Sequence, residues 1–108
     1  MSRREPRYLT VTIDERPDAS EMTPWTLYVV GNGEHPFCAA MLCPCGCNEA
    51  LYMSLVEDDD PKWRVKVYTD ATATMVPSVW RVVGCRSHFI LFRGRVLWVR
   101  SYWDRRRR

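Results

Sequence analysis

The feature that most constrains the fold is a cluster of cysteines in one short segment, C-P-C-G-C, which holds Cys43, Cys45 and Cys47. Pro44 fixes one φ angle and Gly46 permits a positive φ, so the backbone can turn sharply and bring the sulfurs together. Cys85, which follows a glycine far downstream, can supply a fourth thiolate. Zinc binds four thiolates in a tetrahedron, so the sequence predicts a fold that places residue 85 against this turn.

Roles for the thiols other than zinc binding have less support from the sequence. Five cysteines is an odd number, which argues against a disulfide framework. The sequence contains neither the apolar core of a secretion signal nor an apolar run of about 18 residues, so we expect a cytoplasmic protein without a membrane span. Thiols stay reduced there. Buried inert thiols and a redox cluster remain as alternatives to zinc. Four thiolates would close the site, which makes the expected zinc structural, and Cys38 is expected to be a small core residue.

The periodicity of the apolar residues is mostly two, which is typical of β-strands. Strands are expected at residues 8–13, 25–30, 50–56, 63–68, 78–83, 88–92 and 95–100. The run HFILFRGRVLW reads as a β-hairpin, and residues 37–42 fit either one helical turn or a strand. The sequence therefore predicts a mainly β protein, a compact small sandwich or half-barrel of short antiparallel strands held together by one structural zinc.

The 108 residues fit a single domain, residues 1–108, with a core at about 8–100 and loose termini at 1–7 and 101–108. The net charge of +3 comes from the four arginines that end the chain. Without them, 12 basic side chains face 13 acidic ones. Nucleic-acid binding is therefore not expected, although the arginine tail leaves a contact with nucleic acid or an acidic protein surface open. Nothing in the sequence indicates an oligomeric state.

A serine and a histidine lie near the expected zinc ligand. His88 follows Cys85 by three residues, and Ser78 stands in the stretch VPSVW just upstream. If the strands that begin at these two residues lie side by side, they form a nucleophile and its general base. Ser87 would point to the opposite face of the strand from His88, so Ser78 is the preferred nucleophile.

A catalytic histidine is commonly oriented by an acidic group. Glu34 and Asp70 are the candidates for this third position, and we assign it to Glu34. No other feature of the sequence distinguishes the two carboxylates.

Three segments together, AAMLCPCGC, PSVWR and GCRSHFILFRGRVLW, resemble a family of small bacterial proteins. Its members occur in Bub-type operons beside genes for ubiquitin-like conjugation, which are linked to antiphage defence. The resemblance covers roughly residues 25–99. It departs from the family pattern at Asn48, where the family has glycine, and asparagine tolerates the left-handed conformation well.

The resemblance implies a zinc-containing serine peptidase, deubiquitinase-like, that processes or removes a bacterial ubiquitin-like protein. It implies Ser78 as nucleophile, His88 as general base, and zinc on Cys43, Cys45, Cys47 and Cys85. The implied partners are the ubiquitin-like protein and its E1-like and E2-like enzymes. An extended tail of that protein could bind by adding to a sheet edge. The alternative is a non-catalytic zinc-containing module that recognises a ubiquitin-like protein or a conjugating enzyme.

Overall fold

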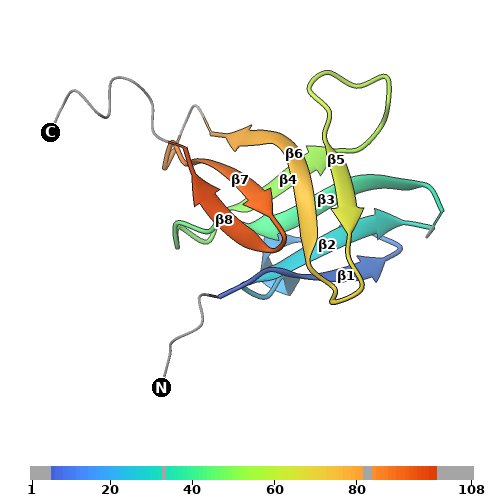
Figure 1. Ribbon diagram of the computed structural model, residues 1–108, viewed down its shortest axis with the longest axis horizontal. Coiled ribbons are helices and arrows are strands. Elements are labelled where there is room, and N and C mark those ends of the chain that lie inside the picture. Colours follow the sequence, from blue (N-terminus) through green and yellow to red (C-terminus); the bar gives the residue numbers. More distant parts are fainter. Residues whose placement is uncertain (1–5, 33, 82–83, 100–108) are drawn as a thin grey trace, which may run out of the picture.

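The computed structural model describes residues 6–32, 34–81 and 84–99, which form two four-stranded β-sheets (Figure 1). The first sheet contains β1 (Leu9–Ile13), β2 (Thr26–Gly31), β3 (Pro36–Leu42) and β4 (Ala50–Ser54). The second sheet contains β5 (Arg64–Val67), β6 (Ala73–Trp80), β7 (His88–Phe92) and β8 (Arg95–Trp98). Over these residues the helical structure is one short 3-10 helix, Ala19–Glu21, and no helix has the length and apolarity to cross a membrane.

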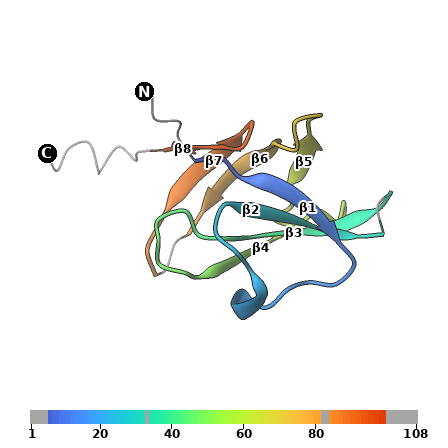
Figure 2. The ribbon, with the colours of Figure 1, turned by 90° about the horizontal axis from the view of Figure 1, so that it is seen from below.

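The first sheet has the strand order β1-β2-β3-β4, and its first pair is parallel. A parallel pair needs a crossover connection of a dozen or so residues. Residues 14–25 provide it and carry the 3-10 helix under the outer face of the sheet (Figure 2). A second apolar cluster forms on that face around Met22, Tyr28 and Val30.

The second sheet has the order β5-β6-β7-β8 and is antiparallel throughout. β7 and β8 form the expected hairpin, and its turn residues Arg93 and Gly94 have φ of 48° and 81°. Two-residue hairpin turns of this kind need positive φ at both positions. A Cβ at Gly94 would lie 2.8 Å from the carbonyl oxygen of Tyr8, so the position also needs a residue without a side chain.

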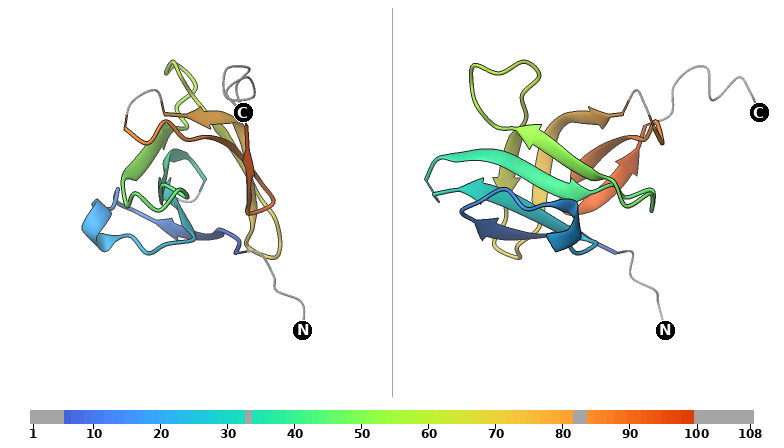
Figure 3. Two further views of the ribbon diagram at one scale, coloured as in Figure 1. Left: turned by 90° about the vertical axis from the view of Figure 1, so that its left-hand side faces the viewer. Right: turned by 180° about the vertical axis from the view of Figure 1, so that it is seen from behind.

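The main core lies between the two sheets, and the strands surround it in the end-on view of Figure 3. Its fully buried members include Leu27, Met41, Met75 and Phe89. Tyr8 closes one side: its N–H donates to the Gly94 carbonyl oxygen at 2.8 Å, and its hydroxyl donates to the Leu42 carbonyl oxygen at 2.7 Å. Both sheets are therefore tied to the segment that precedes β1.

The prediction of a mainly β fold is confirmed, and residues 37–42, expected as either one helical turn or a strand, belong to a strand, β3. Two details differ from the expectation. β6 begins at Ala73, earlier than the expected residue 78, and a register shift between Met75 and Val79 accommodates Pro77 inside the strand. The parallel pairing of β1 with β2 was not expected. The single domain stays a prediction, and the predicted loose end at 101–108, with its arginines, lies outside the described residues, as do residues 1–5.

Candidate active site and metal centre

Two turns at one end of the molecule bring the four cysteines together. The β3–β4 turn carries three of them and the β6–β7 turn carries Cys85, and the four sulfurs lie within 4.8 Å of one another. The first turn is closed by the N–H of Cys43 donating to the Glu49 carbonyl oxygen at 2.8 Å. Gly46 and Asn48 have φ of 94° and 63°, the conformation expected from the sequence. The cluster thus connects the two sheets.

The sulfur positions fit a tetrahedral metal ion. The Sγ atom of Cys43 lies 3.5 Å from that of Cys45 and 3.6 Å from that of Cys85. Zn–S bonds of about 2.3 Å in a tetrahedron place the sulfurs about 3.8 Å apart. The four cysteines are therefore close enough to hold a metal ion, and a set of four thiolates is one that zinc prefers.

The thiols differ in their affinity for protons. Burial raises the pKa of Cys43 to about 12. Burial acts in the same direction on Cys85, but hydrogen bonds from the Ser87 side chain and backbone outweigh it and lower the pKa of Cys85 to about 6. Ser87 is buried, and its Oγ lies 3.1 Å from the Cys85 sulfur. A bound cation would displace the remaining protons, because thiolate is the form that binds metal.

Arg81 faces the cluster from the start of the β6–β7 turn. Its guanidinium donates to the sulfur of Cys85 at 3.2 Å and to that of Cys47 at 3.6 Å. The same group forms an ion pair with Glu49 at 3.3 Å. A positive charge here would compensate the negative charge that four thiolates leave around a divalent ion. Arg81 therefore lies beside the four cysteines that could hold a metal ion.

Ser78 and His88 lie on the opposite face of the second sheet from the core. β6 and β7 are neighbours, with Trp80 opposite His88 and Val79 opposite Phe89. Val79 and Phe89 point into the core, so the alternating residues face outward. Ser78 Oγ lies 2.9 Å from His88 Nε2, within hydrogen-bond distance. The structure thus brings together the serine and the histidine that the sequence selected.

Two tryptophans support this pair. The Trp80 ring stacks on the His88 imidazole, with 5.0 Å between ring centroids and 12° between planes. Trp80 itself is 62% exposed, so it covers one face of the imidazole from the solvent side. The Trp63 indole N–H donates to the Ser78 carbonyl oxygen at 3.4 Å, which fixes the backbone under the serine.

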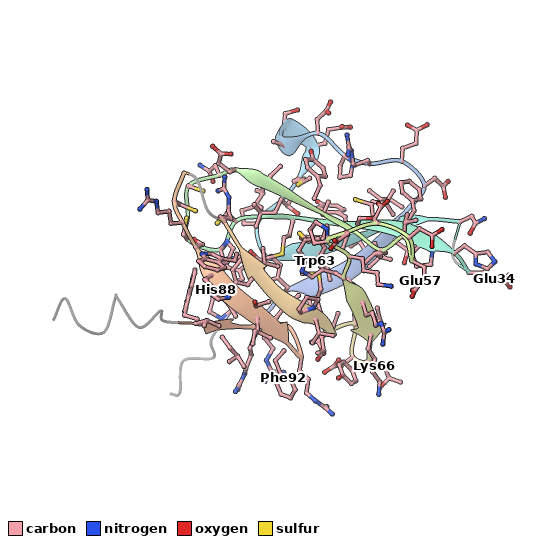
Figure 4. All side chains as sticks on the ribbon, turned by 90° about the horizontal axis from the view of Figure 1, so that it is seen from above. Glu34, Glu57, Trp63, Lys66, His88 and Phe92 are labelled. Carbon is pink, nitrogen blue, oxygen red and sulfur yellow. The ribbon has the colours of Figure 1, made fainter. Side chains whose placement is uncertain are left out.

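The structure does not bring Glu34 to His88. The β2–β3 turn carries Glu34 to the end of the molecule away from His88 (Figure 4). Asp70 lies in the β5–β6 turn, where its carboxylate accepts hydrogen bonds from the N–H and hydroxyl of Thr72. Those bonds lower the pKa of Asp70. Within the described residues, Ser78 is the only side chain hydrogen-bonded to the His88 ring.

Sequence reasoning did not place Trp80 and Trp63 beside the serine–histidine pair, or Arg81 beside the cysteines. A signal for Trp80 was present, because an aromatic residue two positions after Ser78 must share its face of a regular strand. Arg81 and Trp63 gave no such signal, since their contacts depend on the path of two turns. His35 is exposed and lies in the same turn as Glu34.

A small cavity lies beside the serine on the outer face of the second sheet. It has a volume of about 300 Å³ and is lined by Lys62, Arg64, Val76 and Pro77. Pro77 directly precedes Ser78, so this cavity lies next to the serine along β6. Its lining combines an apolar surface with two cationic side chains.

Comparison with known proteins gave one match. The model of the family described as "Bacterial ubiquitination-like system serine protease (BubE)" matches residues 12–99. The matched span includes the four clustered cysteines and the serine–histidine pair. No curated protein and no solved structure matches the chain.

Proposed function

The chain belongs to the BubE family of bacterial ubiquitination-like system serine proteases, and from this premise we propose that Ser78 is the nucleophile and His88 the general base. The observation that carries the proposal is the 2.9 Å distance between Ser78 Oγ and His88 Nε2 on the outer face of the sheet. A base must lie within hydrogen-bond distance of the proton that it removes. For this role His88 carries its own proton on Nδ1, which leaves Nε2 free to accept.

The proposed reaction proceeds through an acyl-enzyme. His88 Nε2 takes the Ser78 proton while Oγ attacks the carbonyl carbon of the scissile bond. The C–N bond then breaks, and the leaving amine takes the proton from His88. His88 next removes a proton from water, the resulting hydroxide attacks the ester, and Ser78 recovers its hydrogen on release of the carboxylic acid product.

Trp80 is proposed to position His88 in place of a carboxylate. The nearly parallel stack holds the imidazole plane in the orientation that points Nε2 at Ser78. An aromatic face also attracts a cation, so the indole stabilises the imidazolium that forms in each step. Glu34 is not part of this proposed site, because the β2–β3 turn holds it far from His88.

We propose that the four cysteines hold a structural zinc. Zinc would supply no open coordination position here, because four thiolates complete its tetrahedron. Its role would be to join the β3–β4 and β6–β7 turns. His88 begins the strand that follows Cys85, so this connection fixes the position of the general base relative to the first sheet.

The proposed substrate is a bacterial ubiquitin-like protein, cleaved at the end of its extended tail. The bond is either a peptide bond of a precursor or the bond to a conjugated target. The E1-like and E2-like enzymes of such a system would be the partners, and the cytoplasm the compartment, where the cysteines stay reduced.

A cleavage assay by intact mass tests this proposal. The wild type and Ser78→Ala are each incubated with the ubiquitin-like protein encoded nearest to the gene for this chain, and zinc is measured in both. We expect the wild type to shorten the tail and Ser78→Ala to leave it intact with an equal zinc content. Ser20→Ala, an exposed serine in the 3-10 helix, is the matched control and should cleave like the wild type.

A fluorophosphonate probe gives a second readout that needs no substrate. It should add one adduct to the wild type and none to Ser78→Ala. Cleavage retained in Ser78→Ala would reject Ser78 as the nucleophile. Binding of the ubiquitin-like protein without cleavage or labelling would favour the non-catalytic recognition module.

A further inference from the structure

β5 is an outer strand of the second sheet: β6 pairs with one side of it, and within residues 6–32, 34–81 and 84–99 no strand pairs with the other (Figure 1). The register shows which backbone groups are free. Tyr68 N–H, just after β5, donates to the Thr72 carbonyl oxygen. In an antiparallel pair every second residue bonds to the partner strand, so Lys66 and Arg64 also bond to β6. Val65 and Val67 alternate with them and direct their N–H and C=O groups away from β6. Across the described residues, the N–H and C=O groups of Val65 and Val67 form no backbone hydrogen bond outside the sheet.

The free edge of β5 faces a groove of about 730 Å³. Side chains from both sheets line it, and three of the large apolar ones are strongly exposed: Phe37 at 46%, Val56 at 41% and Val67 at 50%. Trp63 and Val65 form its inner wall and pack against the main core. The groove therefore combines a row of unpaired backbone groups with an apolar floor, the two features that an extended peptide needs to bind as an added strand.

Two groove residues, Trp63 and Arg64, also lie next to the serine–histidine site. Trp63 lines the groove and donates to the Ser78 carbonyl oxygen at 3.4 Å. Arg64 lines both the groove and the small cavity beside Pro77. In Figure 4, Trp63 lies between His88 and Glu57, which is another groove residue. Trp63 N–H, on the same edge as Val65 and Val67, donates to the Ser54 carbonyl oxygen at 2.8 Å, so the free edge ends at Val65. A chain in the groove can reach Ser78 by crossing Arg64 toward the small cavity beside Pro77.

We propose that the extended tail of the ubiquitin-like substrate binds along the free edge of β5, antiparallel to it. The direction rests on the proposed function: the end of the tail must reach Ser78, and β5 begins at the Ser78 side with Arg64 opposite Val76. The tail therefore passes Val67 first and Val65 last, and then crosses Arg64 toward Ser78. Its backbone pairs with the N–H and C=O groups of Val65 and Val67, in the antiparallel manner that is the more stable per residue.

The geometry sets which tail residues pair. Neighbouring strands lie about 4.8 Å apart, so the tail strand and Ser78 are separated by two spacings, about 10 Å. Extended chain covers about 3.3 Å per residue, so about three residues bridge from the groove to the serine. The pairing residues are then those about four to seven positions before the scissile bond. Every second one faces the floor near Phe37 and Val65, so apolar side chains are expected at alternate positions.

Proline substitution tests the free edge without breaking the sheet. Val67→Pro removes only an N–H that points away from β6, and edge strands tolerate proline at such positions. Val96→Pro is the matched control on β8, the opposite edge. Val99 N–H donates to the His88 carbonyl oxygen, so Val96, three residues earlier, also directs its N–H away from its partner strand. Both changes are made in the Ser78→Ala background, in which binding is measured without turnover.

The probe is a fluorescein-labelled synthetic peptide of the last ten residues of the ubiquitin-like protein described above. We expect Val67→Pro to weaken binding at least tenfold and Val96→Pro to leave it within twofold, with unfolding temperatures of the two variants compared. Hydrogen exchange gives an independent readout on Ser78→Ala itself. Saturating peptide should slow exchange at the Val65 and Val67 amides, while the Arg64 and Lys66 amides, already paired with β6, change little.

The outcomes separate this inference from the proposed function. If the wild type cleaves the protein but Val67→Pro binds the peptide as Val96→Pro does, and the two valine amides stay unprotected, the groove is not the tail site and the protease assignment stands. If the wild type does not cleave but peptide protects both amides and Val67→Pro abolishes binding, the groove stands as a recognition site and the catalytic assignment fails.

Discussion

The cysteine cluster and the serine–histidine pair both involve the β6–β7 hairpin, the cluster through its turn and the pair through its two strands. The pair forms within one sheet, between residues ten positions apart, and depends only on the register of β6 against β7. The cluster joins two sheets, and two of its sulfurs in contact, those of Cys43 and Cys85, are 42 positions apart. Buried Ser87, the last residue before β7, lies against the sulfurs, and the next residue, His88, faces outward, so two neighbouring residues serve the two sites.

Because of this difference, substitutions in the two sites should have different effects on the protein. A contact between distant segments restricts the whole chain, so its loss is felt as lost stability. A contact between two strands of one hairpin closes only a short loop and adds little to the stability of the fold, so its loss should reduce catalytic activity more than stability. Substitutions in the two sites can therefore separate folding from catalysis.

The largest effect is expected from Cys43→Ala, which removes the buried ligand of the cluster. With the proposed zinc lost, we expect more than about 4 kcal/mol of destabilisation, which lowers Tm by about 20 °C in a domain of this size. Thermal unfolding and zinc content measure it. Cys38→Ala is the control, a buried thiol outside the cluster, and should cost about 1 kcal/mol with zinc retained. Equal losses in the two variants would contradict a stabilising metal.

His88→Gln should produce the opposite pattern. We expect kcat/KM to fall by about 10³-fold or more, because the general base is removed. Tm should change by no more than a few degrees, since the imidazole is only half-buried and its ring bonds to Ser78 alone among the described side chains. Kinetics and thermal unfolding on one preparation measure both. A large loss of Tm would show that His88 stabilises the fold, and the two sites would then not differ in the way described.

Arg81→Gln tests the charge beside the cluster. Losing the guanidinium leaves the thiolates uncompensated, so we expect metal affinity to fall by about tenfold to a hundredfold. Competition with a chromophoric chelator measures the affinity. Arg81→Lys keeps the charge but not the planar group that reaches two sulfurs and Glu49, and should recover only part of the loss. An unchanged metal affinity in Arg81→Gln would show that Arg81 does not contribute to metal binding.

The smallest effect is expected from Trp80→Ala. The stack on His88 contributes about 1 kcal/mol, so kcat should fall about fivefold while KM stays near the wild-type value. Trp80→Phe, which retains an aromatic face, should restore most of kcat, as steady-state kinetics of the three proteins would show. A rise in KM without a change in kcat would instead assign Trp80 to substrate binding.

Much of this arrangement could be predicted because it depends on patterns between residues that are close in sequence. The density of cysteines in one short turn predicted their convergence, and Asn48 took the left-handed conformation expected of it. Alternating apolar residues located most strands. Ser78 and His88 could be paired because strands close in sequence commonly lie side by side.

What could not be predicted depends on how distant segments turn. Glu34 was selected from residue type alone, yet the direction of the β2–β3 hairpin decides where it lies. The parallel pairing of β1 with β2 requires the path of residues 14–25, which has no strong periodicity. Trp63 reaches Ser78 only because β5 pairs with β6 in one register, and a register shift of one residue would reverse the face of every side chain.

The contact between Tyr8 and Gly94 has a consequence for the timing of folding. The N–H of Tyr8 bonds to a turn near the other end of the described chain, so the first strand cannot be locked in place until the last hairpin exists. Chains whose contacts join distant residues fold slowly, and synthesis proceeds at about 5–20 residues per second. The contact that ties the N-terminal segment to the second sheet can therefore form only after residue 94 has been synthesised. The serine–histidine pair, which needs only β6 and β7, can form before that contact does.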